Sequence, residues 1–116
     1  HYRFAALAGL ARVALGRGHA AEAVATIEPL LAEMAAFDGG TEQHLIRHAC
    51  WQVLNEAHDP RAPAMLATAV ARLQTHADSI DDALLRHSFL TRIPHNRALV
   101  DAARGAAGAE VNKSQD

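Results

Sequence analysis

The stretch LARVALGRG, residues 10–18, decides the fold, and two apolar residues, Ala23 and Ile27, follow it at fixed distances. The pattern returns 39 residues later as ACWQVLNEA, residues 49–57, again followed by two apolar residues, Ala62 and Leu66. A period in this range is typical of units that cannot bury their apolar face alone and must stack on their neighbours. We therefore expect an all-α fold that is built from repeated pairs of helices.

The composition agrees with a helical domain and excludes several classes of function. Of the 116 residues, 50% are hydrophobic and only 4% are aromatic, and 27 are alanine, which favours helices that approach one another closely. The formal net charge is −2, and the basic residues are scattered. We therefore expect neither direct nucleic-acid binding nor a membrane surface as partner, and no stretch is apolar enough to span a bilayer.

The single cysteine, Cys50, excludes an internal disulfide, and no secretory signal is visible, so we expect a cytoplasmic protein. The chain starts at His1 rather than at a methionine, which suggests a segment of a longer protein. The high content of alanine and arginine is typical of a GC-rich bacterial genome.

Apolar residues at three- and four-residue steps predict five or six helices joined by short turns. The first helix should cover residues 3–15 and the second 20–37, bent near Ala25 by Pro29. Thr41 should cap the third helix, and Asp59 should cap a fourth that starts at Pro60. A fifth helix should bury Leu84, Leu85, Phe89 and Leu90 and stop before Ile93. A sixth should run from Pro94 to about Arg104.

The helix pairs resemble tetratricopeptide repeats. Leu10, Ala11, Ala14, Gly18, Ala23 and Ile27 match that family's pattern in the first pair, and Ala49, Cys50, Val53, Ala57, Ala62 and Leu66 match it in the second, with Ala57 in place of the turn glycine. We expect the small residues Ala11, Ala23, Cys50 and Ala62 at the helix crossings. The larger residues Leu10, Ile27, Val53 and Leu66 should fill the spaces beside them. The resemblance implies an α-solenoid domain over residues 1–104, with units at about 3–37 and 42–77, a helical cap at about 81–104, and a flexible tail at 105–116.

A second resemblance rests on three strings: DPRA at residues 59–62, LRHSFL at residues 85–90 and IPHNR at residues 93–97. They are similar to the C-terminal helical repeats of large bacterial regulators, in which an ATPase domain is joined to a DNA-binding domain of the LuxR or antibiotic-regulator kind, or to a nucleotide cyclase. The resemblance implies a docking or sensing portion of a transcriptional or signalling protein. ATP binding, DNA binding or cyclisation would then belong to other parts of the parent protein.

One stripe on the third helix is the candidate binding site: His44, Arg47, His48, Trp51 and Asn55 lie at helical steps on the side opposite Ile46 and Val53. In stacked helix pairs this side of the first helix commonly lines a groove, so a tryptophan among polar donors could anchor a protein or peptide partner, or a second copy of the chain. The alternative is that Trp51 packs against a neighbouring repeat.

Metal binding and catalysis have weaker support in the sequence. His44 and His48 stand four residues apart, a spacing that can hold zinc, so a histidine-based metal binder is an alternative function. No complete ligand set accompanies them, and Ser88 next to His87 lacks the third group of a catalytic triad. Cys50 is interpreted as a small buried apolar residue. We expect a docking or oligomerisation module that is no enzyme and holds no cofactor or metal, and a purely structural end of a longer solenoid is the other alternative.

Overall fold

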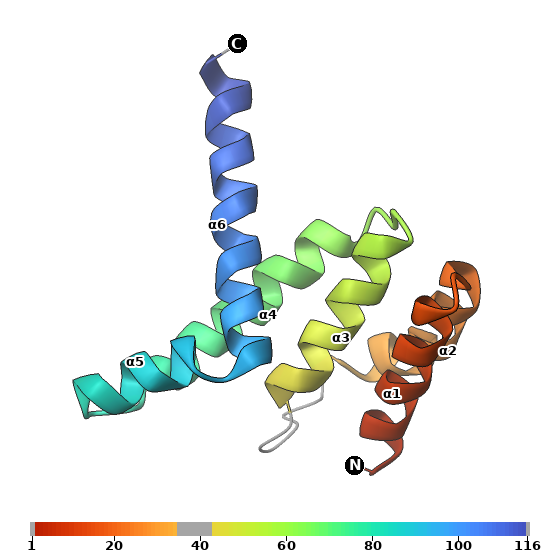
Figure 1. Ribbon diagram of the computed structural model, residues 1–116, viewed down its shortest axis with the longest axis horizontal. Coiled ribbons are helices and arrows are strands. Elements are labelled where there is room, and N and C mark those ends of the chain that lie inside the picture. Colours follow the sequence, from red (N-terminus) through yellow and green to blue (C-terminus); the bar gives the residue numbers. More distant parts are fainter. Residues whose placement is uncertain (1, 35–42, 116) are drawn as a thin grey trace.

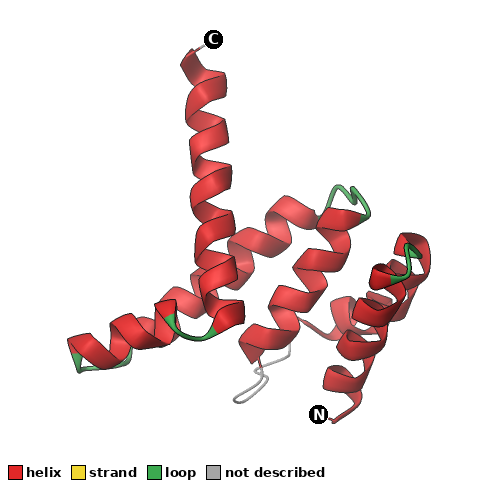
Figure 2. Cartoon of the chain, in the orientation of Figure 1, coloured by secondary structure: helices red, strands yellow, loops and turns green. Residues whose placement is uncertain are grey.

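The computed structural model describes the backbone of residues 2–34 and 43–115, and the side chains of residues 5–34 and 43–107. In this part of the chain every regular element is a helix, and Figure 2 shows helices joined by turns without any strand. The predicted all-α class is confirmed. The helices are α1 (Tyr2–Gly16), α2 (Ala20–Glu33), α3 (Gln43–Glu56), α4 (Ala62–Asp78), α5 (Ala83–Thr91) and α6 (Pro94–Gln115).

The helices pack mainly with their neighbours along the chain. α1 packs on α2, α3 packs on α4, and α1 also lies against α3. The chain then folds back, so that the first part of α6 contacts α3, α4 and α5. The later part of α6 then projects beyond the other helices (Figure 1). No described helix is both long enough and apolar enough to cross a membrane.

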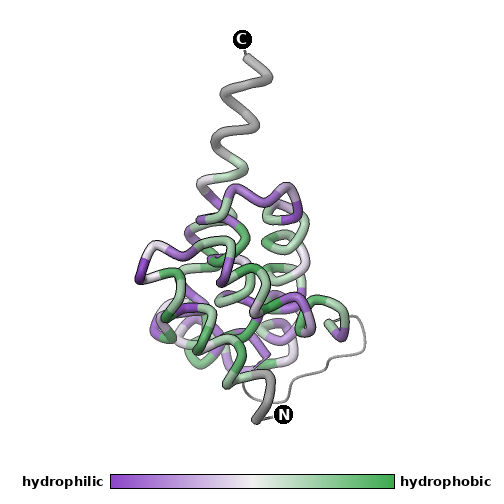
Figure 3. Tube along the Cα trace, turned by 90° about the vertical axis from the view of Figure 1, so that its right-hand side faces the viewer, coloured by the Kyte–Doolittle hydropathy of each residue, from purple (hydrophilic) through white to green (hydrophobic). Residues whose placement is uncertain are grey.

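Two clusters of buried side chains hold this arrangement together, and hydrophobic residues recur along the helices that supply them (Figure 3). The first cluster joins α1, α2 and α3, together with Ala62 of α4, and consists largely of small residues; Ala8, Ala11, Ala14, Ala23, Ile27, Ala49, Cys50 and Val53 are among its members. The second joins α4 and α6 through Leu66, Ala69, Leu73 and Leu99, with Phe89 of α5 packed against it. Trp51 is partly buried and contacts both clusters.

Two similar turns end α1 and α3. In the first, Gly18 has a φ of 78°, and the N–H of His19 donates to the carbonyl of Ala14 (2.9 Å). In the second, His58 has a φ of 56°, and the N–H of Asp59 donates to the carbonyl of Leu54 (2.9 Å). Both are Schellman-type ends, in which a left-handed residue closes the helix.

The second turn differs in one detail from the prediction. His58, not Ala57, takes the place of Gly18, so the two turns are 40 residues apart, whereas the repeated sequence pattern is offset by 39. The second turn therefore has one residue fewer between its left-handed position and the first buried alanine of the next helix. The buried residues of α2 and α4 keep the offset of 39: Ala23, Ile27 and Leu30 correspond to Ala62, Leu66 and Ala69, and all six are buried.

The helix starts also differ from prediction. α4 begins at Ala62 with Pro63 in its first turn, so Pro60 lies in the preceding turn and not at the first helical position. The side chain of Asp59 accepts a hydrogen bond from the N–H of Arg61 (2.9 Å) within this turn. α5 is capped by Asp82, whose carboxylate accepts the N–H groups of Leu84 and Leu85. As predicted, α5 stops before Ile93 and α6 starts at Pro94.

Three leucines that were expected to be buried are exposed. Leu10 is 61% exposed because α1 turns this side away from both α2 and α3. On α5, Leu84 and Leu85 are 81% and 63% exposed, and this nine-residue helix has no fully buried residue. Only one side of α5, which includes Phe89 and Leu90, packs against the rest of the molecule.

The last helix is longer than predicted. α6 continues to Gln115 instead of ending near Arg104, although residues 105–115 combine three alanines, which favour a helix, with two glycines, which do not. The predicted flexibility of residues 105–116 stays a prediction. The proposed cap Thr41 and residues 35–37 of the predicted second helix lie outside the described residues.

Candidate partner-binding site

The stripe predicted on α3 does not form a single exposed surface. His44 and Arg47 are buried, with exposures of 3% and 1%, while His48 and Trp51 are half-buried and Asn55 is exposed. Two of its five members are buried because α3 is covered on several sides: α1, α2, α4 and α6 all contact it. His44 and Arg47 therefore contribute almost no exposed surface on α3, although Arg47 borders a cleft. Partner binding by His48, Trp51 and Asn55 stays a prediction.

His44 instead belongs to a buried junction between α3, α4 and α5. Its Nε2 lies 2.7 Å from Nδ1 of His76, so one of these nitrogens donates a hydrogen bond to the other. The rings of His44 and His76 both contact Phe89, with centroids 5.8 and 4.6 Å away. Burial, with a further contribution from His76, lowers the pKa of His44 to about 4. The ring is therefore neutral at pH 7.

The histidine spacing does not produce a metal cluster in the described part of the chain. His44 pairs with His76, 32 residues away, and not with His48. No three His, Cys, Asp or Glu side chains among the described residues converge closely enough to hold a metal ion.

Cys50 is fully buried, as predicted from its place in the repeat. Burial raises the pKa of its thiol to about 12, the nearby charge of Arg47 opposing the shift. The thiol is therefore protonated at neutral pH and is a poor nucleophile, since the thiolate is the reactive form.

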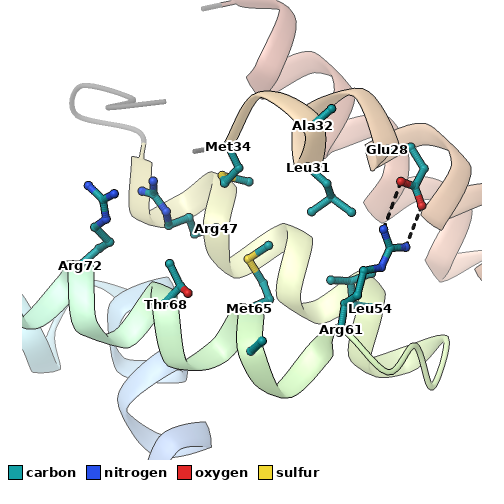
Figure 4. A pocket seen from close by; sticks show the side chains of 11 residues that line it. Glu28, Leu31, Ala32, Met34, Arg47, Leu54, Arg61, Met65, Thr68 and Arg72 are labelled. Carbon is teal, nitrogen blue, oxygen red and sulfur yellow. Dashed lines mark hydrogen bonds and ion pairs between the residues drawn. The ribbon is translucent and has the colours of Figure 1, made fainter. Parts of the chain in front are cut away.

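The structure shows a different candidate site, a cleft between α2 and α4 whose floor is formed by α3 (Figure 4). Its volume is about 500 Å³, and it is open to solvent. We call it the α2–α4 cleft; its lining residues are Glu28, Leu31, Ala32 and Met34 of α2, Arg47 and Leu54 of α3, and Arg61, Ala64, Met65, Thr68 and Arg72 at or within α4. Its middle is apolar, with Leu31 and Met34 of α2 facing Met65 of α4 (Figure 4).

At one end of the α2–α4 cleft, ion pairs connect α2 to the start of α4. The guanidinium of Arg61 donates to both carboxylate oxygens of Glu28 (3.1 and 2.7 Å) and to Asp59 (2.9 Å). These hydrogen bonds lower the pKa of Glu28, and they lower that of Asp59 to about 2. Two carboxylates share one guanidinium here, so this end carries a formal charge of −1.

The opposite end carries two arginines, Arg47 and Arg72, which lie side by side in Figure 4. Arg47 is buried, and its Nη1 donates to Gln43 (3.5 Å). Burial and then the charge of Arg72 lower the pKa of Arg47. Arg72 is exposed, and among the described residues no carboxylate forms an ion pair with it. This end therefore presents one buried and one exposed guanidinium group.

Sequence reasoning missed the cleft, although part of its pattern is visible. Arg61, Met65, Thr68 and Arg72 stand at steps of four, three and four residues, which is a helical stripe beside the buried stripe of Ala62, Leu66 and Leu73. A stripe of mixed arginine, methionine and threonine resembles an ordinary solvated face. Only the position of α2 relative to α4 makes it the wall of a cleft.

Comparison with known proteins gives one match. A family model described as a C-terminal domain, TP_0123_C, matches residues 2–107. No curated protein and no solved structure matches the chain. Since the family model spans nearly all of the sequence, the chain belongs to the TP_0123_C family.

Proposed function

We propose that the chain is a docking module of tetratricopeptide-like helix pairs, and that it binds a peptide segment of another protein in the α2–α4 cleft. Its proposed place is the C-terminal part of a bacterial regulatory protein. The family's description as a C-terminal domain supports that place. The observation that carries the docking proposal is the open cleft itself, with its apolar middle between two helices that leave space for side chains of a partner.

The packing of the pairs supports the tetratricopeptide-like architecture. The four small residues expected at the helix crossings, Ala11, Ala23, Cys50 and Ala62, are all buried, with exposures of 5% or less. Each pair is formed by consecutive helices, and the first helices of the two pairs lie against each other. Stacks of this kind present extended surfaces to their partners.

A selection of peptides from a random phage-displayed library on the immobilised chain tests the proposal. Ala64 is exposed and lines the cleft, so the substitution Ala64→Trp should fill the cleft without disturbing the buried core. We expect it to weaken binding of the selected peptides at least tenfold in fluorescence polarisation.

Ala71→Trp is the matched control, because Ala71 is also an exposed alanine of α4 but does not line the cleft. Both variants should keep the helicity of the parent chain in circular dichroism. Equal affinity of both variants for the selected peptides would contradict this location of the site, and a selection that enriches no peptide would contradict the docking function.

A purely structural end of a longer solenoid is the second candidate function. The exposed leucines of α1 and α5, Leu10, Leu84 and Leu85, favour it, because they are apolar side chains that a neighbouring segment could cover. Under this alternative the purified chain binds no selected peptide, and removing it causes the parent protein to aggregate.

A further inference from the structure

Four helices, α3, α4, α5 and α6, meet around a pair of histidines. His44 of α3 is 3% exposed, and its Nε2 lies 2.7 Å from Nδ1 of His76 on α4. Phe89 of α5 contacts both rings, and the side chain of Asn96 on α6 donates to the carbonyl of Phe89 (3.0 Å). Phe89 therefore connects α5 and α6 to the histidine pair on α3 and α4.

The geometry of the pair fits neutral imidazole rings. A neutral ring carries one N–H group and one bare nitrogen, so one ring can donate to the other across the 2.7 Å between His44 and His76. When both rings are protonated, every ring nitrogen carries a hydrogen, and two N–H groups point at each other. This conflict arises from the pair itself, whatever other charges lie nearby.

A single proton on His44 is also unfavourable. Its Nδ1 is buried and has no hydrogen-bond partner among the described residues, so the charged ring would hold an unpaired N–H group inside the protein. Burial is the main reason why the pKa of His44 falls to about 4, and His76, Arg47 on α3 and His95 on α6 lower it further. α5 contributes the uncharged ring of Phe89. His44 therefore takes up a proton readily only after the four helices have separated here.

α5 is the helix that can leave this site most easily. It has no fully buried residue, and it lies at the opposite end of the molecule from α1 (Figure 1). α3 and α4 are fixed by fully buried residues of their own, such as Val53 and Leu73. Since segments with few buried contacts open first, opening should begin with α5 and the first turn of α6 and leave α1 and α2 in place.

We propose that His44 and His76 form an acid-sensitive latch, which holds α5 and the start of α6 on α3 and α4 while both rings are neutral and releases them on protonation. Release uncovers Trp51 and the leucines of the second cluster, against which Phe89 and Leu90 now pack. The latch is independent of the proposed docking function, because neither histidine of the pair lines the α2–α4 cleft.

Hydrogen exchange of the whole chain at pH 7 and pH 5, corrected for the intrinsic effect of pH on exchange, tests the latch. If the pKa of His44 returns from about 4 to 6.5 on opening, the equilibrium constant for opening rises about twentyfold between these pH values. The amides of α5 should show this rise. The amides of α2, a helix without histidines, should not. The emission of Trp51, the single tryptophan, should shift to longer wavelength at pH 5. Equal rises in α5 and α2 would mean global unfolding and overturn the latch.

His44→Gln is the decisive variant, because glutamine keeps a hydrogen-bonding group but does not titrate. Most of the acid-induced rise at α5 should disappear, and a smaller part should remain because burial also lowers the pKa values of His48 and His95. His87→Gln is the matched control, since His87 is an exposed histidine of α5, and this variant should keep the full rise. An equal rise in the two variants would overturn the latch. The comparison of α5 with α2 uses the parent chain, so it decides the question even if His44→Gln does not fold.

Discussion

The two buried clusters are stabilised in different ways. The cluster that joins α1, α2 and α3 consists of alanines and other apolar side chains, so among the described residues close packing holds its helices together. The junction of α3, α4, α5 and α6 mixes leucines with three buried or half-buried polar groups, His44, His76 and Asn96. The first region should therefore respond to changes of side-chain volume, and the second to protonation and to the loss of hydrogen bonds.

The largest effect should come from the packed cluster. Ile27 is fully buried in α2, and Ile27→Ala should lower the free energy of unfolding by about 2–5 kcal/mol, because it removes apolar contacts and leaves a cavity. Urea denaturation followed by circular dichroism measures the change. Leu10→Ala is the control on α1, where an exposed side chain should contribute within about 0.5 kcal/mol. A similar loss in both variants would contradict the assigned core.

The polar junction should make stability depend on pH. The pKa of His44 is about 4 in the folded chain and 6.5 as its ordinary value, so the unfolded chain binds a proton more readily between these two values. Stability is therefore complete above about pH 6.5 and falls as the pH is lowered towards 4. The loss between pH 7 and pH 5 should be about 2 kcal/mol. Denaturation in urea at the two pH values measures it.

His44→Gln tests the origin of this pH dependence, because glutamine keeps a hydrogen-bonding group but does not titrate. The groups that act on His44 are Arg47 on α3, His76 on α4 and His95 on α6. Burial also lowers the pKa of His48 and of His95, so a smaller slope of the same sign should remain. An unchanged pH dependence in the variant would show that the junction is not its source.

A smaller effect should follow from removing the hydrogen bond between α5 and α6. The buried side chain of Asn96 donates through Nδ2 to the carbonyl of Phe89 (3.0 Å). Asn96→Ala leaves that carbonyl without this donor and should cost about 1–2 kcal/mol. Hydrogen exchange should show the amides of α5 opening before those of α1. Asn55 is exposed, so Asn55→Ala should leave hydrogen exchange in α1 and α5 unchanged. Equal exchange in Asn55→Ala and Asn96→Ala would contradict this role of Asn96.

The smallest effect concerns the start of α5. Asp82 accepts two backbone N–H groups, and Asp82→Ala should cost about 1 kcal/mol. Because α5 has no fully buried residue, the loss should appear as local fraying and faster hydrogen exchange at residues 83–86. Asp82→Asn can still accept these bonds and should restore most of the protection. Failure of asparagine to do so would indicate that charge, not capping, matters at this position.

The sequence pattern predicts which residues of a helix are buried better than it predicts which other helices contact that helix. The offset of 39 residues correctly places Ala23, Ile27, Ala62 and Leu66 in the core, because each helix buries one stripe whatever its neighbour is. The burial of His44 and Arg47 could not be predicted from periodicity, since it depends on helices that fold back from far along the chain. The α2–α4 cleft was missed for the same reason: the sequence of α4 shows the stripe, but the position of α2 relative to α4 decides that the stripe lines a cleft.

The position of Cys50 also has a practical consequence. It is the single cysteine of the chain, and its protonated thiol lies fully inside the cluster of α1, α2 and α3. Alkylating reagents can reach it only when these helices separate. The rate of thiol labelling therefore reports how often the packed region opens. This measurement needs no mutation and does not register motion of α5.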